Sequence, residues 1–267
     1  MMEETKKIAE FFQCGYKIFK KGSEPDKLED AYYKAFEEGK EKGFWPVILV
    51  IEETWTAENF IEEYYGDGYD REKLIQECGD NGKELLEEVY NRYIKEYYDD
   101  EEELIGRDTY SGYLDFDEDE YYNEEEDDDE EYDDDDNELN HFCSYLSYNN
   151  EDILISDVLL LEVPVKNPWE IIAWFPFGGW NECPMPEDMI AICKYWYEAY
   201  GAVPAVFTSD IIEFYAPDKI KGADSIETAK EHFAFCTDRV LQGTMTYTLA
   251  ELADCIENST VWYFWWD

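Results

Sequence analysis

The sequence predicts an α+β protein: a mixed β-sheet flanked by helices and interrupted by a long acidic insertion. Apolar runs of strand length occur in both halves of the chain, and stretches of helical period separate them. Between the halves lies a segment too acidic to pack into a core. The expected parts are an N-terminal α/β part over residues 1–98, the acidic low-complexity insertion over 99–150, and a C-terminal α+β domain over 151–267.

Helices are expected where apolar residues recur every three to four positions behind a capping residue or a proline. Pro25 opens one such run and Thr56 is an N-cap for another. Pro186 is followed by Glu187 and Asp188, which suit the positive end of a helix dipole. These patterns predict helices over residues 3–13, 25–42, 56–65, 70–98 with a break near 79–82, 186–200, 225–238 and 248–257.

Strands are expected where short apolar or alternating runs are bounded by turn residues. The run FWPVILVI at residues 44–51 is apolar throughout, which predicts a strand covered on both faces at the centre of the sheet. The run PWEIIAWF at 168–175 alternates as a strand does, and the glycine pair at 178–179 then allows a turn. Further strands are expected at residues 16–19, 153–165, 203–207 and 211–215 as a hairpin, and 260–266.

The charge of the chain is its most unusual property. Its 68 Asp and Glu residues outnumber 21 Lys and Arg residues, which gives a net charge of −47. A field of this sign repels phosphate backbones and anionic membranes and attracts basic proteins, so we expect neither direct nucleic-acid binding nor membrane association. The first residues do not have the pattern of a signal peptide, and no apolar run is as long as a membrane helix, which favours a cytoplasmic protein.

Residues 99–138 hold 24 of the acids and one base, Arg107. Like charges at this density repel, and few apolar residues offset the chain entropy, so a solvated loop is expected. Three roles are open: a solubilising insertion, a docking arm for a basic protein, and a weak sponge for divalent cations. The docking arm would present the carboxylates of Asp117, Glu118, Asp119, Glu120, Glu124, Glu125, Glu126, Asp127, Asp128, Asp129, Glu130, Glu131, Asp133, Asp134, Asp135 and Asp136.

Cysteine and histidine usage gives no catalytic constellation. The seven cysteines are scattered without a CxxC pair, so they are expected to be reduced, and we expect no metal and no cofactor. His232 and Cys236 stand four apart on a predicted helix, which is the spacing of a Cys–His pair or of half a zinc site. Cys183 precedes a predicted helix, whose dipole would lower the pKa of its thiol; the alternative is a small buried thiol packed beside tryptophan. No phosphate-binding loop, nucleophile elbow or zinc-protease motif occurs, and we expect no enzyme.

A polar pocket in the C-terminal part is the alternative to a purely interacting protein. Its polar residues would lie under a roof of tryptophans, or would satisfy backbone groups around the glycine turns instead. The candidate pocket residues are Trp180, Asn181, Cys183, Cys236, Asp238, Gln242, Trp262 and Trp265.

The C-terminal part also resembles a bacterial domain-of-unknown-function family, over residues 158–267. The motifs that carry the resemblance are Pro168-Trp169-Glu170, the run FGGWNECP at 177–184, Tyr195-Trp196 with Tyr200-Gly201-Ala202, a CxDxVxQG pattern at 236–243, and the aromatic run at 262–267. Since that family has no established activity, the resemblance marks motif positions without roles. Its members resemble small acidic proteins that bacterial genomes pair with toxins, which is an association and not a mechanism.

Two functions follow as hypotheses. The first is an immunity or antidote-type protein that binds and neutralises a basic partner, a nucleic-acid-targeting toxin domain, by occluding its site with carboxylates. The second is a small-ligand-binding or enzymatic module that uses the turn at residues 180–183 together with Cys236 and Asp238. A third reading makes the acidic insertion a solubility device only.

Overall fold

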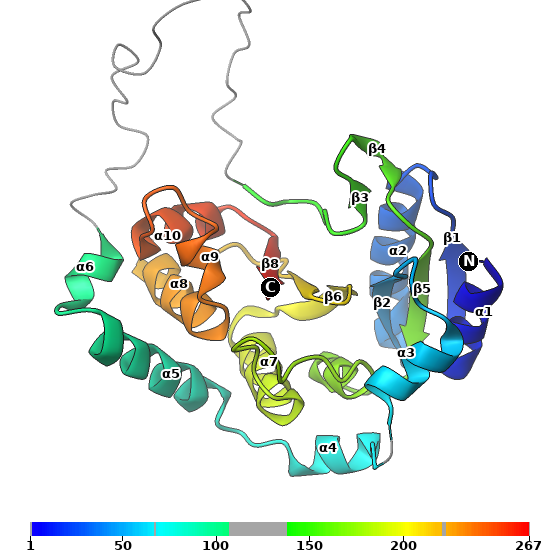
Figure 1. Cartoon of the computed structure of the whole chain (residues 1–267), viewed down its shortest axis with the longest axis horizontal. Coiled ribbons are helices and arrows are strands. Elements are labelled where there is room, and N and C mark those ends of the chain that lie inside the picture. The colour runs from blue at the N-terminus through cyan, green and yellow to red at the C-terminus, as the bar shows by residue number, and fades with distance from the viewer. Residues whose placement is uncertain (1, 67, 107–137, 221–222, 267) are drawn as a thin grey trace, which may run out of the picture.

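The computed structural model describes residues 2–66, 68–106, 138–220 and 223–266, and a six-stranded mixed sheet forms its centre (Figure 1). The parallel pair is β2 with β6, and every other neighbouring pair is antiparallel. The predicted α+β class is confirmed, and strands from both halves of the chain share this one sheet. The strand order is β1 (Gly15–Phe19), β5 (Val158–Val163), β2 (Trp45–Val50), β6 (Val203–Phe207), β7 (Ile211–Tyr215) and β8 (Val261–Trp265).

The strand β2 lies where the apolar run predicted, between β5 and β6, and all six of its residues are buried. A strand with neighbours on both edges and helices over both faces has no solvated side, so apolar residues are favoured at every position. A separate two-stranded ribbon consists of β3 (Leu146–Ser147) and β4 (Asn150–Leu154).

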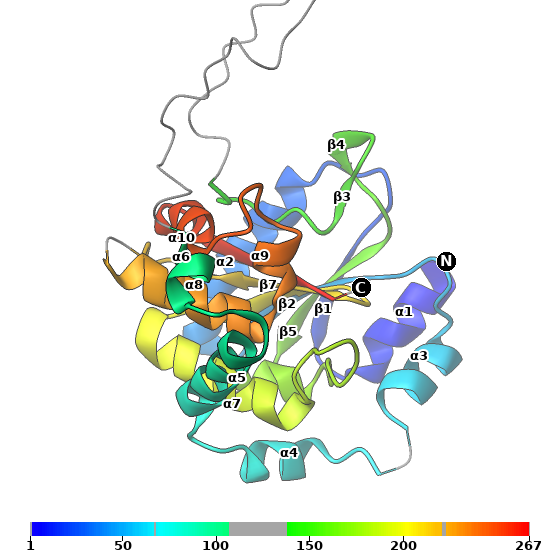
Figure 2. The ribbon, with the colours of Figure 1, turned by 60° about the vertical axis from the view of Figure 1, so that its left-hand side comes forward.

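Helices cover both faces of the sheet (Figure 2). Consecutive strand residues point to opposite faces. Accordingly Tyr215 contacts the rings of Tyr33 and Phe36 on α2, whereas Phe214 contacts Trp196 on α7 and Phe235 on α8. The described helices are α1 (Met2–Phe11), α2 (Asp26–Lys42), α3 (Ala57–Tyr64), α4 (Arg71–Glu77), α5 (Gly82–Tyr97), α6 (Glu101–Ile105), α7 (Pro186–Tyr200), α8 (Ala223–Phe235), α9 (Asp238–Leu241) and α10 (Leu249–Glu257).

The run PWEIIAWF is not a strand, contrary to the sequence prediction, but a 3₁₀ helix, η1 (Pro168–Ala173). Its burial is consecutive instead of alternating, because Ile171, Ile172 and Ala173 are all buried. The carboxylate of Glu170 accepts hydrogen bonds from the backbone N–H of Lys166 (3.1 Å) and from the Asn167 side chain (2.8 Å). This side chain closes the turn locally, and Pro168 at the first helical position lacks the N–H that a strand would pair.

The strand expected over residues 153–165 is two strands, β4 and β5, separated by Ile155, Ser156 and Asp157. Asp157 is buried, and its carboxylate accepts hydrogen bonds from the Thr5 hydroxyl (3.1 Å) and the Lys21 backbone N–H (3.0 Å). These bonds hold a bend between the strands. The apolar pattern alone gave no sign of it, because residues on both sides of the bend are apolar.

Both ends of the predicted insertion, residues 99–106 and 138–150, belong to the described fold. Within 99–150, α6 and the ribbon strand β3 are regular structure, and Leu104, Ile105, Phe142 and Tyr145 are buried in the core. Burial of these apolar side chains stabilises both ends of the stretch despite its high density of negative charge. In the described ranges, no helix has the length and apolar character needed to cross a membrane.

Candidate functional site

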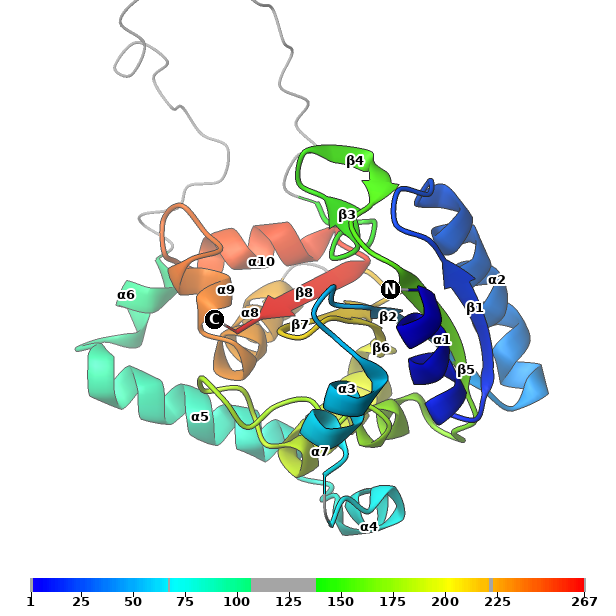
Figure 3. The same ribbon diagram turned by 45° about the vertical axis from the view of Figure 1, so that its right-hand side comes forward.

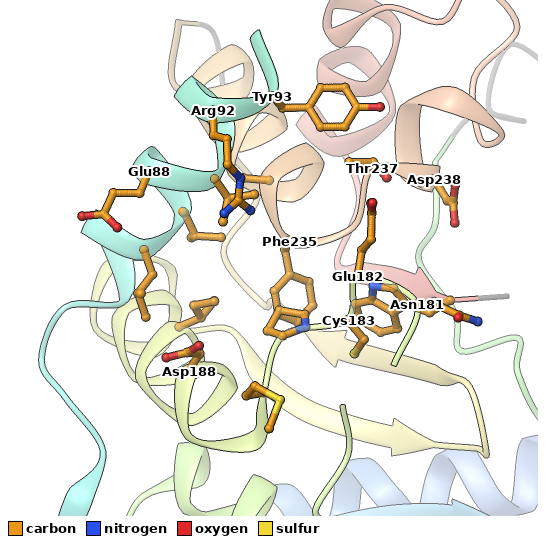
Figure 4. A pocket seen from close by; sticks show the side chains of 18 of the residues that line it. Glu88, Arg92, Tyr93, Asn181, Glu182, Cys183, Asp188, Phe235, Thr237 and Asp238 are labelled. Atoms are coloured by element: carbon orange, nitrogen blue, oxygen red, sulfur yellow. The ribbon is translucent and has the colours of Figure 1, made fainter. Parts of the chain in front are cut away.

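A groove of about 750 Å³ lies between α5, the loop before α7 and the end of α8 (Figure 4). Ligand sites have volumes of this order. Among the residues that line it, all of which the structure describes, Arg92 is the only base. The lining carboxylates come from four elements of the fold and are Glu88, Glu96, Glu182, Asp188 and Asp238.

The helix α5 supplies one wall of this groove. Figure 4 shows Arg92 extending from α5 toward Phe235, and no described carboxylate lies within ion-pair distance of its guanidinium. Tyr93 packs edge-on against Phe233, with ring centroids 4.9 Å apart, and its ring lies 4.5 Å from that of Tyr97. Burial raises the pKa of the Tyr93 hydroxyl, and the negative charges of Glu182 and Asp238 raise it further. The wall is therefore aromatic, and the potential around it is negative.

The loop between η1 and α7 supplies the opposite wall in a strained conformation. Asn181 (φ 43°) and Glu182 (φ 64°) are consecutive non-glycine residues in the left-handed region. Strain of this kind costs about 1–3 kcal/mol per residue and clusters at functional sites. Hydrogen bonds within the loop hold it in place, since the Gly179 N–H donates to the carbonyl of Pro184 (3.1 Å) and the Cys183 N–H donates to that of Trp180 (2.7 Å).

The structure brings three of the eight candidate pocket residues into this groove: Asn181, Cys183 and Asp238. Gln242 does not line the groove, but its exposed side chain donates a hydrogen bond to the Asp238 carboxylate (2.8 Å). Trp180 packs on Phe177, with ring centroids 4.7 Å apart. The tryptophans that were expected to roof the pocket do not line this groove. Trp262 and Trp265 line a separate cavity beside β8, and Trp266 and Phe235 line the groove instead. The docking-arm residues from Asp117 to Asp136 lie outside the described residues.

The cysteines near the groove are buried thiols. Burial raises the pKa of Cys183, and the neighbouring Cys236 raises it further. The pKa of Cys236 is raised to about 11, again by burial. A thiol activated by the dipole of α7 would have a lowered pKa, so the packing alternative fits Cys183 better.

His232 and Cys236 do not form a pair. The thiol of Cys236 donates to the Trp265 carbonyl (3.0 Å), and the His232 ring lies between Trp262 and Phe264, at centroid distances of 4.5 and 4.8 Å. Burial lowers the pKa of His232 well below its usual value, so the ring is neutral at pH 7. In the described part of the chain, no group of three or more His, Cys, Asp or Glu side chains is placed to hold a metal ion.

Sequence reasoning missed Glu231 on α8, whose carboxylate is fixed by three neutral donors. The hydroxyls of Tyr195 (2.7 Å) and Tyr200 (3.2 Å) donate to one oxygen, and the Trp196 indole N–H (2.9 Å) donates to the other. The Tyr195-Trp196 and Tyr200 motif thus acquires a role: it ties α7 to α8 through one half-buried acid. Burial raises the pKa of Glu231, although the three donors partly oppose this. No pattern distinguishes this acid from the chain's 67 others, because its donors lie 31–36 residues away.

The replacement Glu231→Gln should change how stability depends on pH. Because the folded-state pKa of Glu231 is raised, the stability it contributes is fully present below the pKa of an unfolded Glu, about 4.3, and is lost as pH rises through the folded-state pKa. Relative to wild type, the variant should therefore gain free energy of unfolding as pH rises, which urea denaturation from about pH 4 to about pH 8 would measure. Glu198→Gln removes an exposed charge from the same region and is the control. If the free energy of unfolding of Glu231→Gln falls relative to wild type as pH rises, the argument that burial raises the pKa of Glu231 is contradicted.

Comparison with known proteins gives one match. Residues 159–267 match the model of a family described as a domain of unknown function (DUF4253). The C-terminal part of this chain is therefore similar to that domain. The match begins in β5 and includes the strained loop, Glu231 and β8, whereas α5 and its side of the groove lie outside it. Searches of curated proteins and of solved structures found no match.

Proposed function

We propose that this protein is an immunity or antidote-type partner of a basic protein, a nucleic-acid-targeting toxin domain, and neutralises it by covering its cationic surface. The observation that carries the proposal is the groove of five carboxylates on a chain of net charge −47. Carboxylates can take the place of the phosphates that such a cationic surface binds.

The negative charge is not confined to the acidic insertion. Residues 107–137 contain 18 acids and one arginine, so the rest of the chain still has 50 acids and 20 bases. The residues outside this range therefore carry a strong negative field of their own. Such a field steers a cationic partner and raises association rates about 10- to 1,000-fold at low salt.

The groove suits the insertion of a basic side chain. Its walls offer aromatic faces in Tyr93 and Tyr97 next to the carboxylates of Glu182 and Asp238, and a cation on an aromatic ring is attracted as well as ion-paired. The strained loop holds Glu182 at the rim before a partner arrives, so little ordering entropy is lost on binding. We propose that the charged end of an arginine or lysine side chain of the partner enters this groove.

The test begins with capture of partners on the full-length protein from its native host, at low and at high salt. A basic protein that is retained only at low salt, and whose nucleic-acid-cleaving activity is blocked by this protein, is the expected result. Recovery of neutral or acidic proteins only, or retention that salt does not weaken, would overturn the proposal.

The double variant Glu182→Gln/Asp238→Asn should bind that partner about tenfold more weakly or worse, because each lost close charge pair costs roughly 1 kcal/mol or more. Calorimetric titration measures the change. The matched control is Glu37→Gln/Glu41→Gln, which removes two exposed charges from α2 and should change the affinity less than about threefold. Equal effects of the two double variants would place the contact elsewhere.

A small-ligand or enzymatic module remains a second candidate because two consecutive residues of the groove wall, Asn181 and Glu182, are strained. The variants Cys183→Ala and Asp238→Ala separate the candidates. A binding protein keeps its partner when the Cys183 thiol is removed, whereas a catalyst that uses this turn loses turnover with both variants.

A further inference from the structure

The groove between α5 and the loop before α7 carries an exposed apolar side chain on each wall. Tyr97 ends α5 and is 62% exposed, and Met185 precedes α7 and is 51% exposed. Both line the groove, and Figure 3 shows α5 running beside the loop before α7. Single exposed apolar side chains are common, but two on one groove indicate a partner that offers apolar as well as charged groups.

The ring of Tyr97 is exposed but supported by its neighbours. Its centroid lies 4.5 Å from that of Tyr93, whose ring packs on the buried Phe233 at 4.9 Å. A side chain that is already ordered loses little entropy when a partner covers it. The Glu96 carboxylate raises the pKa of the Tyr97 hydroxyl, and the charge of Glu182 on the opposite wall adds to this. The exposed ring and the Glu182 carboxylate therefore belong to the same end of the groove.

Met185 lies against the glycine pair of the strained loop. Its sulfur is next to Gly179, where an added Cβ would come within 3.1 Å of it. Gly179 has φ 86°, and its N–H donates to the Pro184 carbonyl (3.1 Å), which fixes the loop beside the methionine. A thioether is flexible and polarisable, so it adapts to apolar groups of different shapes. Because Glu182 belongs to the same loop, this wall offers a charge and an apolar contact together.

The interior of the groove is mixed in the same way. Val89, Ile192 and Phe235 are among its lining residues, together with the carboxylates. The charged end of a single arginine or lysine would leave these apolar surfaces uncovered. A volume of about 750 Å³ suits a longer ligand, such as a segment of several residues.

Arg92 restricts the charge pattern of such a segment. It is the only base among the lining residues, all of them described, and Figure 4 shows it to the left of Phe235, with Glu182 and Asp238 to the right. A run of adjacent bases would bring a cation close to Arg92, and like charges placed together at an interface weaken binding. Bases separated by apolar residues avoid this repulsion and also cover the apolar walls.

We propose that the groove binds a segment of the partner in which arginine or lysine residues are separated by apolar residues. The bases lie against Glu182 and Asp238, and the apolar side chains cover Tyr97 and Met185. This inference rests on the proposed function, because it names the element of the basic partner that the groove recognises. The charges then set the association rate, and the apolar contacts slow dissociation.

The test uses two fluorescein-labelled hexapeptides of equal charge, one alternating arginine with leucine and the other alternating arginine with serine. Fluorescence anisotropy with the full-length chain should give an affinity for the leucine peptide that is higher by about tenfold or more, since leucine buries apolar surface. Methionine methyl NMR locates the contact: the Met185 signal should shift saturably with the leucine peptide, whereas that of Met245, which is 79% exposed and outside the groove, should not. Equal affinities for the two peptides, or equal shifts at the two methionines, would overturn the inference.

A double variant and a matched control test the two apolar side chains. In Tyr97→Ser/Met185→Ser, the preference for the leucine peptide should fall to about threefold or less. The control Tyr148→Ser/Met245→Ser removes the same two residue types from exposed positions outside the groove and should keep the preference. The ratio of the two affinities is compared, because Tyr97 also faces the partner's cation.

The outcomes distinguish this inference from the proposed function. If both peptides bind wild type in a salt-dependent manner and Tyr97→Ser/Met185→Ser keeps the full preference for leucine, the apolar contacts are rejected and the electrostatic proposal stands. If neither peptide binds at low salt, the proposed function and this inference both fail.

Discussion

Replacement of Trp196 by alanine is expected to lower the free energy of unfolding by about 4 kcal/mol or more, the largest single effect in the fold. Trp196 is completely buried at the point where α7 and α8 meet the sheet. Removing it leaves a cavity that the surrounding rings are too rigid to fill. The rings it contacts, at centroid distances of 4.8–5.5 Å, belong to Phe214, His232, Phe235, Trp262 and Phe264.

The variant Trp196→Phe separates packing from hydrogen bonding. It keeps one aromatic ring in place and loses the indole N–H that donates to Glu231, so a cost of about 2 kcal/mol is expected. Urea denaturation of both variants and of wild type measures these differences. A Trp196→Ala protein within about 1 kcal/mol of wild type would mean that α7, α8 and β8 do not share this interior.

Replacement of Gly178 by alanine is expected to cost about 3 kcal/mol and to displace the strained loop. Gly178 has φ 112°, which L-residues rarely adopt, and a Cβ there would overlap the carbonyl oxygen of Pro184. The backbone carbonyl cannot move without breaking the loop's hydrogen bonds to Gly179. Because this loop carries Asn181 and Glu182, partner affinity should fall together with stability.

Gly22 provides the matched control, since it also has positive φ (78°) but a Cβ added there would have no atom of the described residues within 4 Å. Gly22→Ala should therefore cost only the conformational strain, about 1 kcal/mol, and should leave partner binding unchanged. Thermal unfolding and partner titration of both alanine variants compare the two sites. Equal losses of stability at Gly178 and Gly22 would rule out the clash with Pro184.

The parts of the fold that could be predicted from the sequence are those set by local chemistry. The apolar run of β2, the Thr56 cap of α3 and Pro186 at the start of α7 each determine their element within a few residues. The prediction for η1 was wrong because alternation of apolar residues does not reveal that the Glu170 carboxylate binds back to Lys166 and Asn167. Local hydrogen bonds from a side chain to nearby backbone groups can stabilise a turn where the apolar pattern alone predicts a strand.

The candidate site shows the same limit. Asn181, Cys183 and Asp238 could be associated from glycine turns and helix starts, and the structure brings them to one groove. The opposite wall comes from α5, about 90 residues earlier, and no local pattern joins Arg92 and Tyr93 to them.

The association rate of the captured partner, followed by stopped-flow fluorescence over a range of ionic strengths, tests the electrostatic account most directly. Because salt screens charges beyond a Debye length of about 8 Å at physiological ionic strength, the rate constant should fall at least about tenfold between low and physiological salt. The dissociation rate should change much less. An association rate that does not depend on salt would contradict the claim that the acidic surface exists to attract a basic partner.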